Sequence, residues 1–366
     1  MRKKHSQFVV CMDSFKGCLT SHEANEAVQR GVRQVLPDAE VIAIPVSDGG
    51  EGFVEACRHI HGGMLHSVQT CDALMRDIEA NYLVCGDTAI IEVAKIIGLA
   101  MLAEEERNPM RASSYGVGTV VADAIQNGAK HIIVGLGGSA TSDSGTGMLR
   151  ALCDVFAPEG TWRDIKVFDG IKFTIATDVN NPLCGKNGAT YTFAPQKGAT
   201  PDMLCQLEKR TLDFATRSAH YFGYDRSNAP GAGAAGGLGY AFMQYLNATC
   251  ESGAAMLLDA THFDTLLPQT DCIFTGEGTA NRQTLMGKLP YTIMQRAKAK
   301  GVPTCLLAGC LEDAASLQKA GFHRTACINP PTLSLQEAMQ KQTALQNLQM
   351  AAAKLTKEWT ETHRQP

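Results

Sequence analysis

The apolar residues at the start of the chain form short runs that alternate with segments of helical periodicity. Residues 8–12 and 41–46 are runs of the length expected for buried strands, and each passes directly into a polar, glycine-containing loop. Apolar residues recur at helical spacing over 20–36 and again over 53–61. This strand–loop–helix order, repeated twice, predicts a parallel sheet with helices packed against it.

The last third of the chain returns to the same order, whereas the middle does not. In the last third we expect strands at 272–275, 302–308 and 325–328 and helices at 290–300, 312–320 and 335–355. In the middle we expect short alternating segments over 65–102, helices at 117–126 and 240–246, and strands at 131–134 and 171–176. The two ends therefore have one character and the middle another.

This pattern predicts a two-domain α/β protein. A Rossmann-like parallel-sheet domain is expected from both chain ends, residues 1–66 and 260–366, with a mixed α/β domain inserted at 67–259. With 366 residues the chain has the length of roughly two domains. A cleft between the two domains is the expected place for a small-molecule ligand.

Composition excludes several classes of function. Lys plus Arg is 33 against 37 Asp plus Glu, with no long run of one sign, so neither a nucleic-acid nor a membrane partner is expected. The thirteen cysteines include no CxxC pair, which favours free thiols in a reducing cytoplasm. A cytoplasmic enzyme with small-molecule ligands is expected, and a homo-oligomer is compatible with this composition.

Several predicted strands end directly in a loop that carries glycine together with a carboxylate, a lysine or a hydroxyl group. In open α/β sheets, ligands bind beyond the carboxyl ends of the strands. One such loop is easily a simple turn, but a set of them favours a binding site. The loops are 13–17, 48–52, 135–141, 177–181 and 276–278.

The loop at 135–141 predicts an anion site. Gly135 to Ala140 matches GxGxxA after a strand, and Ser139 and Thr141 add hydroxyl donors beside a helix start. The alternative is a tight turn between strand and helix. A nicotinamide-dependent oxidoreductase is a weaker hypothesis, since Asp154 lies near the distance of a ribose-binding acid. Gly287–Lys288 lacks the rest of a Walker A motif, so a P-loop enzyme is not expected.

Carboxylates and lysines in these loops suggest phosphoryl chemistry. Asp48 and Glu51 have oxygen ligands of the kind that Mg²⁺ prefers, although Asp48 is equally suited to cap a helix. Lys16 and Lys288 could meet phosphates, where a surface lysine is the plain alternative. Asp178 follows a strand and could orient or deprotonate a hydroxyl group, or merely cap a turn.

Taken together, the motifs resemble the bacterial glycerate kinases that make 2-phosphoglycerate. The resemblance covers nearly the whole chain. The segments that carry it are 13–17 (DSFKG), 48–52 (DGGEG), 113–119 (SSYGVGT), 137–141 (GGSAT), 178–185 (DVNNPLCG), 195–199 (PQKGA), 231–239 (GAGAAGGLG) and 287–290 (GKLP).

The resemblance implies a glycerate kinase-like fold and ATP-dependent, Mg²⁺-dependent phosphorylation of D-glycerate. It implies catalytic roles for Asp178, Lys16 and Asp48, and a metal site at Asp48 and Glu51. The residues that it implies in substrate or phosphate binding are Ser14, Gly137, Gly138, Ser139, Thr141, Asn181, Lys197, Glu277 and Lys288.

One segment departs from the family pattern. Where the family has GEGRID, this chain has Thr279, Ala280 and Asn281 after Gly278, and the nearest arginine is Arg282. A GPLG turn has likewise become the sequence CDAL at 71–74. These departures leave two further hypotheses: a kinase for a related hydroxy or sugar acid, and a non-catalytic ligand-binding paralogue.

Overall fold

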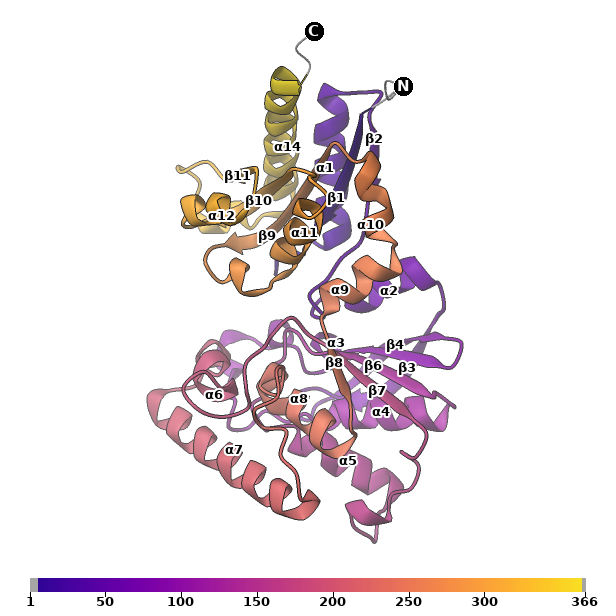
Figure 1. Ribbon diagram of the computed structural model, residues 1–366. Coiled ribbons are helices and arrows are strands. Elements are labelled where there is room, and N and C mark those ends of the chain that lie inside the picture. Colours follow the sequence, from indigo (N-terminus) through magenta and orange to yellow (C-terminus); the bar gives the residue numbers. More distant parts are fainter. Residues whose placement is uncertain (1–5, 364–366) are drawn as a thin grey trace. The chain divides into compact units, whose positions relative to one another are not determined.

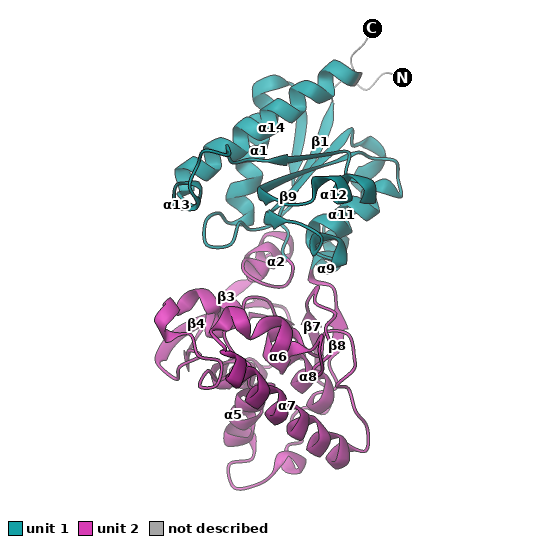
Figure 2. Cartoon of the chain, turned by 90° about the vertical axis from the view of Figure 1, so that its left-hand side faces the viewer, with its two compact units in different colours: residues 1–47, 254–366 teal, residues 48–253 magenta. Residues whose placement is uncertain are grey.

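The structure is a computed structural model that describes residues 6–363. It divides into two compact units, one formed by Met1–Ser47 with Ala254–Pro366 and the other by Asp48–Gly253 (Figure 2). The division falls after residues 47 and 253, compared with the predicted boundaries after residues 66 and 259. Each unit has its own sheet.

The first unit is built on a five-stranded sheet in the order β11-β10-β9-β1-β2. Every pair of neighbouring strands in it is parallel. The strands are β1 (Gln7–Met12), β2 (Glu40–Ala43), β9 (Cys272–Ala280), β10 (Thr304–Leu311) and β11 (Arg324–Cys327). Because all strands run the same way, their carboxyl ends share one edge of the sheet.

Helices cover both faces of this sheet (Figure 1). Alternate residues of β1 point to opposite faces, and both sets are buried: Phe8 and Val10 pack with α1 and α14, while Val9 and Cys11 pack with α9, α10 and α11. The helical segments are α1 (Ser21–Val35), α9 (Gly253–Ala260), α10 (Phe263–Leu266), η5 (Leu267–Gln269), η6 (Thr284–Met286), α11 (Leu289–Lys298), α12 (Ala314–Ala320), α13 (Leu335–Ala338) and α14 (Lys341–His363). The result is a three-layer Rossmann-like unit.

The second unit has a six-stranded mixed sheet in chain order, β3 to β8. The first three strands are antiparallel to one another, and from β5 onward the pairs are parallel. The strands are β3 (Met64–Cys71), β4 (Asp77–Cys85), β5 (Thr88–Glu92), β6 (His131–Gly135), β7 (Lys172–Ala176) and β8 (Thr249–Glu251). The predicted α/β class, with one parallel and one mixed sheet, is confirmed.

One continuous apolar core joins this second sheet to its helices. The core takes residues from strands β4 to β7 and from helices α4, α5 and α8. The helical segments are α2 (Phe53–His61), α3 (Ala94–Ile97), η1 (Leu99–Met101), η2 (Glu104–Glu106), α4 (Tyr115–Gln126), α5 (Thr146–Phe156), η3 (Trp162–Asp164), α6 (Ala189–Phe193), η4 (Pro195–Lys197), α7 (Pro201–Phe222) and α8 (Ala234–Tyr245).

Several predicted elements differ from the structure. The strand predicted at 272–275 continues through the predicted loop 276–278 to Ala280, the strand predicted at 41–46 ends at Ala43, and the helix predicted at 240–246 begins at Ala234. The helix expected over 335–355 is two helices, since α13 ends at Ala338 and α14 runs from Lys341 to His363. The helix expected from 312 begins at Ala314, because β10 continues to Leu311 and Asp313 caps α12 in a left-handed conformation. Within residues 6–363, no helix is both long and apolar enough to cross a membrane.

Candidate functional site

The loop after β1 brings a carboxylate, a hydroxyl and a lysine to the carboxyl edge of the first sheet. The backbone N–H of Asp13 donates to the carbonyl of Gly276 on neighbouring β9, at 2.9 Å. The N–H of Ser14 donates to the Asp13 carboxylate at 2.8 Å, and both residues are buried. Lys16 is exposed at the turn beside Gly17, whose φ of 73° suits glycine. The loop is thus fixed at its base and presents Lys16.

A buried carboxylate within β9, which continues through the predicted loop 276–278 to Ala280, fixes a second lysine. Glu277 accepts from the Thr284 hydroxyl at 2.6 Å through one oxygen and from the Lys288 ammonium at 3.1 Å through the other. Lys288 is the N-cap residue of α11, which continues with Pro290 in its first turn. A helix N-terminus favours anions, so the ammonium and the helix end together suit a phosphate.

Side chains of the segment that departs from the family pattern, residues 279–282, contact residues that follow β10. Arg282 pairs with Asp313 at 2.6 Å, and Asn281 donates to Glu312 at 3.2 Å. Ala280 is fully buried in β9. Arg282 is therefore tied to the loop after β10 and does not replace an arginine at position 279.

In the second unit, three of the predicted loops meet backbone to backbone. The N–H of Gly137 donates to the carbonyl of Gly49 at 3.0 Å. A Cβ at Gly137 would lie 2.3 Å from the Cα of Gly50, and one at Gly49 would lie 2.3 Å from the carbonyl oxygen of Ala176. Asp48 accepts from the N–H of Gly50 at 2.9 Å. Glycine is required here because the chains touch.

Glu92, at the end of β5, is a site residue that the sequence analysis missed. Its buried carboxylate accepts from the N–H of Gly52 at 3.2 Å and from that of Val54 at 3.0 Å, so it caps α2 from outside. Burial raises the pKa of Glu92. The Lys95 ammonium, 3.9 Å from the Glu92 carboxylate, partly offsets this rise. A carboxylate at the end of an apolar strand run was the available signal.

Asp178 and Asn181 lie in the loop that follows β7. Asp178 is half-buried and accepts from the Ser252 hydroxyl at 2.5 Å. The side-chain amide of Asn181 donates to the carbonyl of Asn187 at 2.7 Å. Asp178 is held in place by a neutral hydroxyl donor, which suits a carboxylate that accepts a proton.

Lys197 lies inside the second unit, with 3% of its surface exposed. Its ammonium donates to the Ser139 hydroxyl at 3.1 Å and to the Thr141 carbonyl at 2.6 Å. Burial lowers the pKa of Lys197 to about 7, and the charge of Asp143 partly offsets this. Lys197 therefore links its own segment to the loop at 135–141, whose Ser139 and Thr141 were predicted anion donors.

The second glycine cluster packs against this same loop. Ala235, Gly236 and Gly237 have left-handed backbones inside α8. A Cβ at Gly236 would lie 2.0 Å from the Thr141 carbonyl oxygen. Among residues 6–363, the Thr141 and Ser142 hydroxyls are buried without a hydrogen-bond partner. The glycines of the cluster therefore allow the backbone of α8 to lie against the loop at 135–141. The two hydroxyls remain able to form hydrogen bonds with a ligand.

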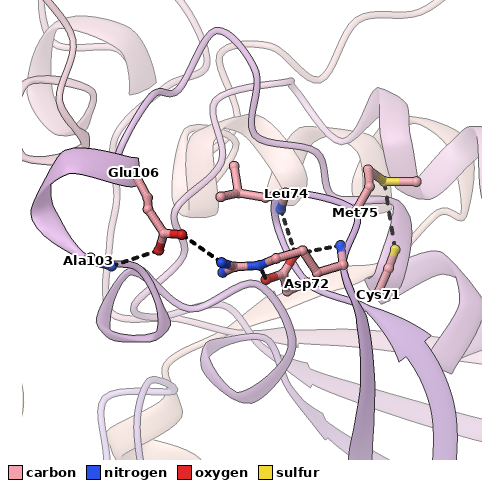
Figure 3. A network of polar contacts seen from close by, with 7 residues as sticks. Cys71, Asp72, Leu74, Met75, Ala103 and Glu106 are labelled. Carbon is pink, nitrogen blue, oxygen red and sulfur yellow. Dashed lines mark hydrogen bonds and ion pairs between the residues drawn. The ribbon is translucent and has the colours of Figure 1, made fainter.

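A polar network joins the turn that contains Asp72 to η2, which contains Glu106 (Figure 3). Asp72 accepts from the side chain of Arg76 at 2.6 Å, and Arg76 also pairs with Glu106 of η2 at 2.6 Å. Although burial opposes ionisation, hydrogen bonds from Arg76 and Leu74 hold the pKa of Asp72 below its usual range. Ion pairs thus anchor the turn at 71–74.

The residue after η2 packs against the residue after Lys197. Arg107 directly follows η2, and a Cβ at Gly198 would lie 2.4 Å from its carbonyl oxygen. Gly198 has φ +91° and comes directly after Lys197. The network therefore fixes the surface against which the turn that carries Lys197 is packed.

The predicted metal ligands, Asp48 and Glu51, flank the close glycine contacts of the second unit. Both side chains are partly exposed. No group of three or more His, Cys, Asp or Glu side chains placed to hold a metal occurs in the part of the chain that is described, residues 6–363. Two carboxylates form a partial ligand set of the kind Mg²⁺ completes with water and phosphate oxygens.

Comparison with known proteins gives the site its context. The model of the glycerate kinase family matches residues 8–161 and 163–360. The chain belongs to the glycerate kinase family. This family comprises kinases, which take a phosphoryl group from ATP, so the predicted enzyme class is confirmed.

Individual relatives agree with this membership. The chain is 36% identical to a glycerate kinase of Halalkalibacterium halodurans, over 91% of this chain and 93% of the relative. It is 35% identical to the glycerate 2-kinase of Escherichia coli, over 84% and 86%. A crystal structure assigned as glycerate kinase 2 from Salmonella typhimurium LT2 superposes with a TM-score of 0.77 at 31% identity, covering 99% of this chain and all of that one.

Proposed function

We propose that this chain phosphorylates D-glycerate to 2-phosphoglycerate with ATP. The family match over residues 8–161 and 163–360 carries the proposal. The geometry of both units supports it, because loops at strand ends present lysines, hydroxyls and backbone amides that suit anionic ligands. ATP and a small hydroxy acid are the partners that follow.

In the first unit, Lys16 and Lys288 are the proposed phosphate contacts. Glu277 keeps the Lys288 ammonium at the N-terminus of α11, at 3.1 Å. Ser14 stands on the same fixed loop as Lys16. Because Glu277 already holds the Lys288 ammonium, this lysine loses less side-chain freedom on binding a phosphate than an unrestrained lysine would.

In the second unit, the loop at 135–141 is the proposed anion cradle. The glycine at 137 lets this loop pack against Gly50, Gly138 follows in a left-handed conformation, and Ser139 and Thr141 supply hydroxyls. Lys197 acts from behind this loop through its two hydrogen bonds to it. Asn181 shapes the neighbouring loop through its bond to Asn187.

For the chemistry itself, Asp178 is the proposed base that takes the proton of the attacking hydroxyl. Asp48 and Glu51 are the residues that would hold Mg²⁺, whose charge would help neutralise the phosphates. Their donor chemistry fits a hard cation. Asp48 already accepts one backbone N–H, which fixes its direction.

The decisive experiment measures ADP release by purified protein with ATP, Mg²⁺ and D-glycerate. Glycerate-dependent release, with a product that enolase converts directly, is the expected result and identifies 2-phosphoglycerate. Release with another hydroxy acid but not with glycerate would show a different acceptor. Absence of release with every acceptor, from protein shown to be folded, would refute the kinase.

A further inference from the structure

A groove of about 510 Å³ lies in the first unit between the edge strand β11 and the last helix, α14. This volume is within the range of small-molecule sites. Pro330, Pro331, Met350 and Ala351 give part of its lining an apolar surface, and charged side chains complete it, namely those of Arg324, Lys354 and Glu358. Nothing proposed above uses these residues.

Two side-chain amides lie at the carboxyl end of β11 in this groove. Asn347 donates to the Oδ1 of Asn329 at 3.1 Å, and Asn329 donates to the carbonyl of Gly309 at 2.8 Å. Each amide has two donors and an acceptor oxygen, so these bonds leave capacity for a ligand. Apolar walls with two amides suit a flat ring that has donors and acceptors on its edge, such as a nucleobase.

The groove lies near enough to Lys288, a proposed phosphate contact, for one nucleotide to reach both. The pairing of Ala308 with both Cys327 of β11 and Glu277 of β9 places Cys327 and Glu277 level with each other, two strand steps of ~4.8 Å apart. Lys288 is fixed to Glu277. A ring beside Cys327 is therefore about 10 Å across the strands from the carboxylate residue that holds Lys288, a separation that a triphosphate can span.

We propose that the groove between β11 and α14 binds the nucleoside part of ATP, with the phosphates directed along the carboxyl edge toward Lys288. This inference rests on the proposed function, since it assigns a subsite to the phosphoryl donor. The walls of the groove contact the base and the two asparagine amides meet its polar edge.

Cys327 gives a direct test in the unaltered protein. It lines the groove and is exposed, whereas Cys205, also exposed, is on α7 of the other unit. Alkylation by iodoacetamide is followed at each cysteine by mass spectrometry. ADP and adenosine should slow labelling of Cys327 at least tenfold and leave Cys205 unchanged. Inorganic tripolyphosphate alone should protect neither.

A matched pair of variants provides the second test. Met350→Trp fills the groove from an exposed position, and Gln346→Trp places the same ring on α14 outside the groove. In equilibrium dialysis of the full chain, Met350→Trp should raise the Kd for ADP at least tenfold. Gln346→Trp should leave it unchanged.

The outcomes separate this inference from the proposed function. Normal ADP binding by Met350→Trp, or equal labelling of Cys327 with and without saturating ADP, would overturn the groove assignment and leave the kinase standing. A change in sedimentation with Met350→Trp, without a change in ADP binding, would assign the groove to a protein contact instead. No ATP or ADP binding by the unaltered chain would refute both.

Discussion

Single ionisable residues inside the second unit link its loops. Lys197, Glu92 and Asp72 are all buried, and each bonds to backbone or side-chain groups of another segment or turn. A buried charge is costly unless it is hydrogen-bonded. These three side chains thus lose their hydration and form hydrogen bonds that hold the loops in place. Replacing them should alter the loops more than the fold.

Replacing Lys197 by Met should change how stability depends on pH. Below pH 7 the lysine is charged in both states, so the folded state bears the desolvation cost. Between pH 7 and the unfolded value of 10.5, only the unfolded chain keeps the proton, so stability rises with pH. We expect urea unfolding at pH 6–9 to show that, above pH 7, the free energy of unfolding of wild type rises relative to that of Lys197→Met. The rise should be at most ~1.4 kcal/mol per pH unit.

Lys186→Met is the control, because Lys186 is exposed in the same unit. Its free energy of unfolding should run parallel to that of wild type over the whole range. If Lys197→Met also ran parallel, the lysine would not be titrating as a buried group.

Glu92→Gln should lower turnover without abolishing folding. Glutamine keeps one acceptor, but its amide NH₂ would face a backbone N–H of Gly52 or Val54, at a cost of about 1–3 kcal/mol. The start of α2 and the loop carrying Asp48 should shift, so kcat should fall about tenfold or more with a small change in KM. Steady-state kinetics of Glu92→Gln beside Glu55→Gln, an exposed change on α2, checks this. Equal kcat in both variants would contradict the positioning role.

At the scale of elements, the glycines of the second unit fix how closely loops approach. The loop after β6 touches the loop before α2 and the left-handed turn in α8. Strands β6 and β7 supply the rigid base, since β6 pairs with β5 and β7 along its length. The site thus depends on contacts in which even one methyl group is too large.

Gly137→Ala should destabilise the protein and reduce activity. The added Cβ would lie 2.3 Å from the Cα of Gly50, where backbone must move, at a cost of about 1–3 kcal/mol. Gly160→Ala is the matched control, because the three atoms nearest to its Cβ all belong to the side chain of Asp164 and none to backbone. Thermal unfolding and kcat/KM measure both effects. A Gly137→Ala protein as stable and active as Gly160→Ala would show that the loops are not in such contact.

At the scale of the whole molecule, two units have separate cores. The cores of the first unit draw on β1, β9 and β10, and that of the second on strands β4 to β7. Two chain crossings connect the units, at Ser47–Asp48 and at Gly253–Ala254. Separate cores favour separate unfolding transitions.

Scanning calorimetry should therefore depart from two-state behaviour. We expect a calorimetric enthalpy larger than the van't Hoff enthalpy, or two resolved peaks. Gly137→Ala, whose contact is inside the second unit, should lower only the transition of that unit. A single transition with equal enthalpies, shifted as a whole by the substitution, would show that the two units unfold together.

Much of this architecture could be predicted from periodicity, and part of the site could not. An apolar run identified β1, which is buried on both faces, and another identified β6, in which His131 and Ile133 are only partly buried. The burial of Lys197 had no local signal, since a lysine in a polar PQKGA segment resembles a surface residue. Its burial arises from packing against Ser139 and Thr141, more than fifty positions earlier. The break between α13 and α14 likewise has no proline to announce it.

The position of β1 in its sheet has a consequence for synthesis. β1 lies between β2 and β9, and residue 8 pairs with residue 272. At roughly 5–20 residues per second, β1 waits roughly 10 to 50 s for β9. The inserted unit, complete by Gly253, is finished before β9 exists. Newly made chains therefore leave the β9 edge of Phe8–Met12 unpaired throughout this interval, and a chaperone that binds strand edges would find it there.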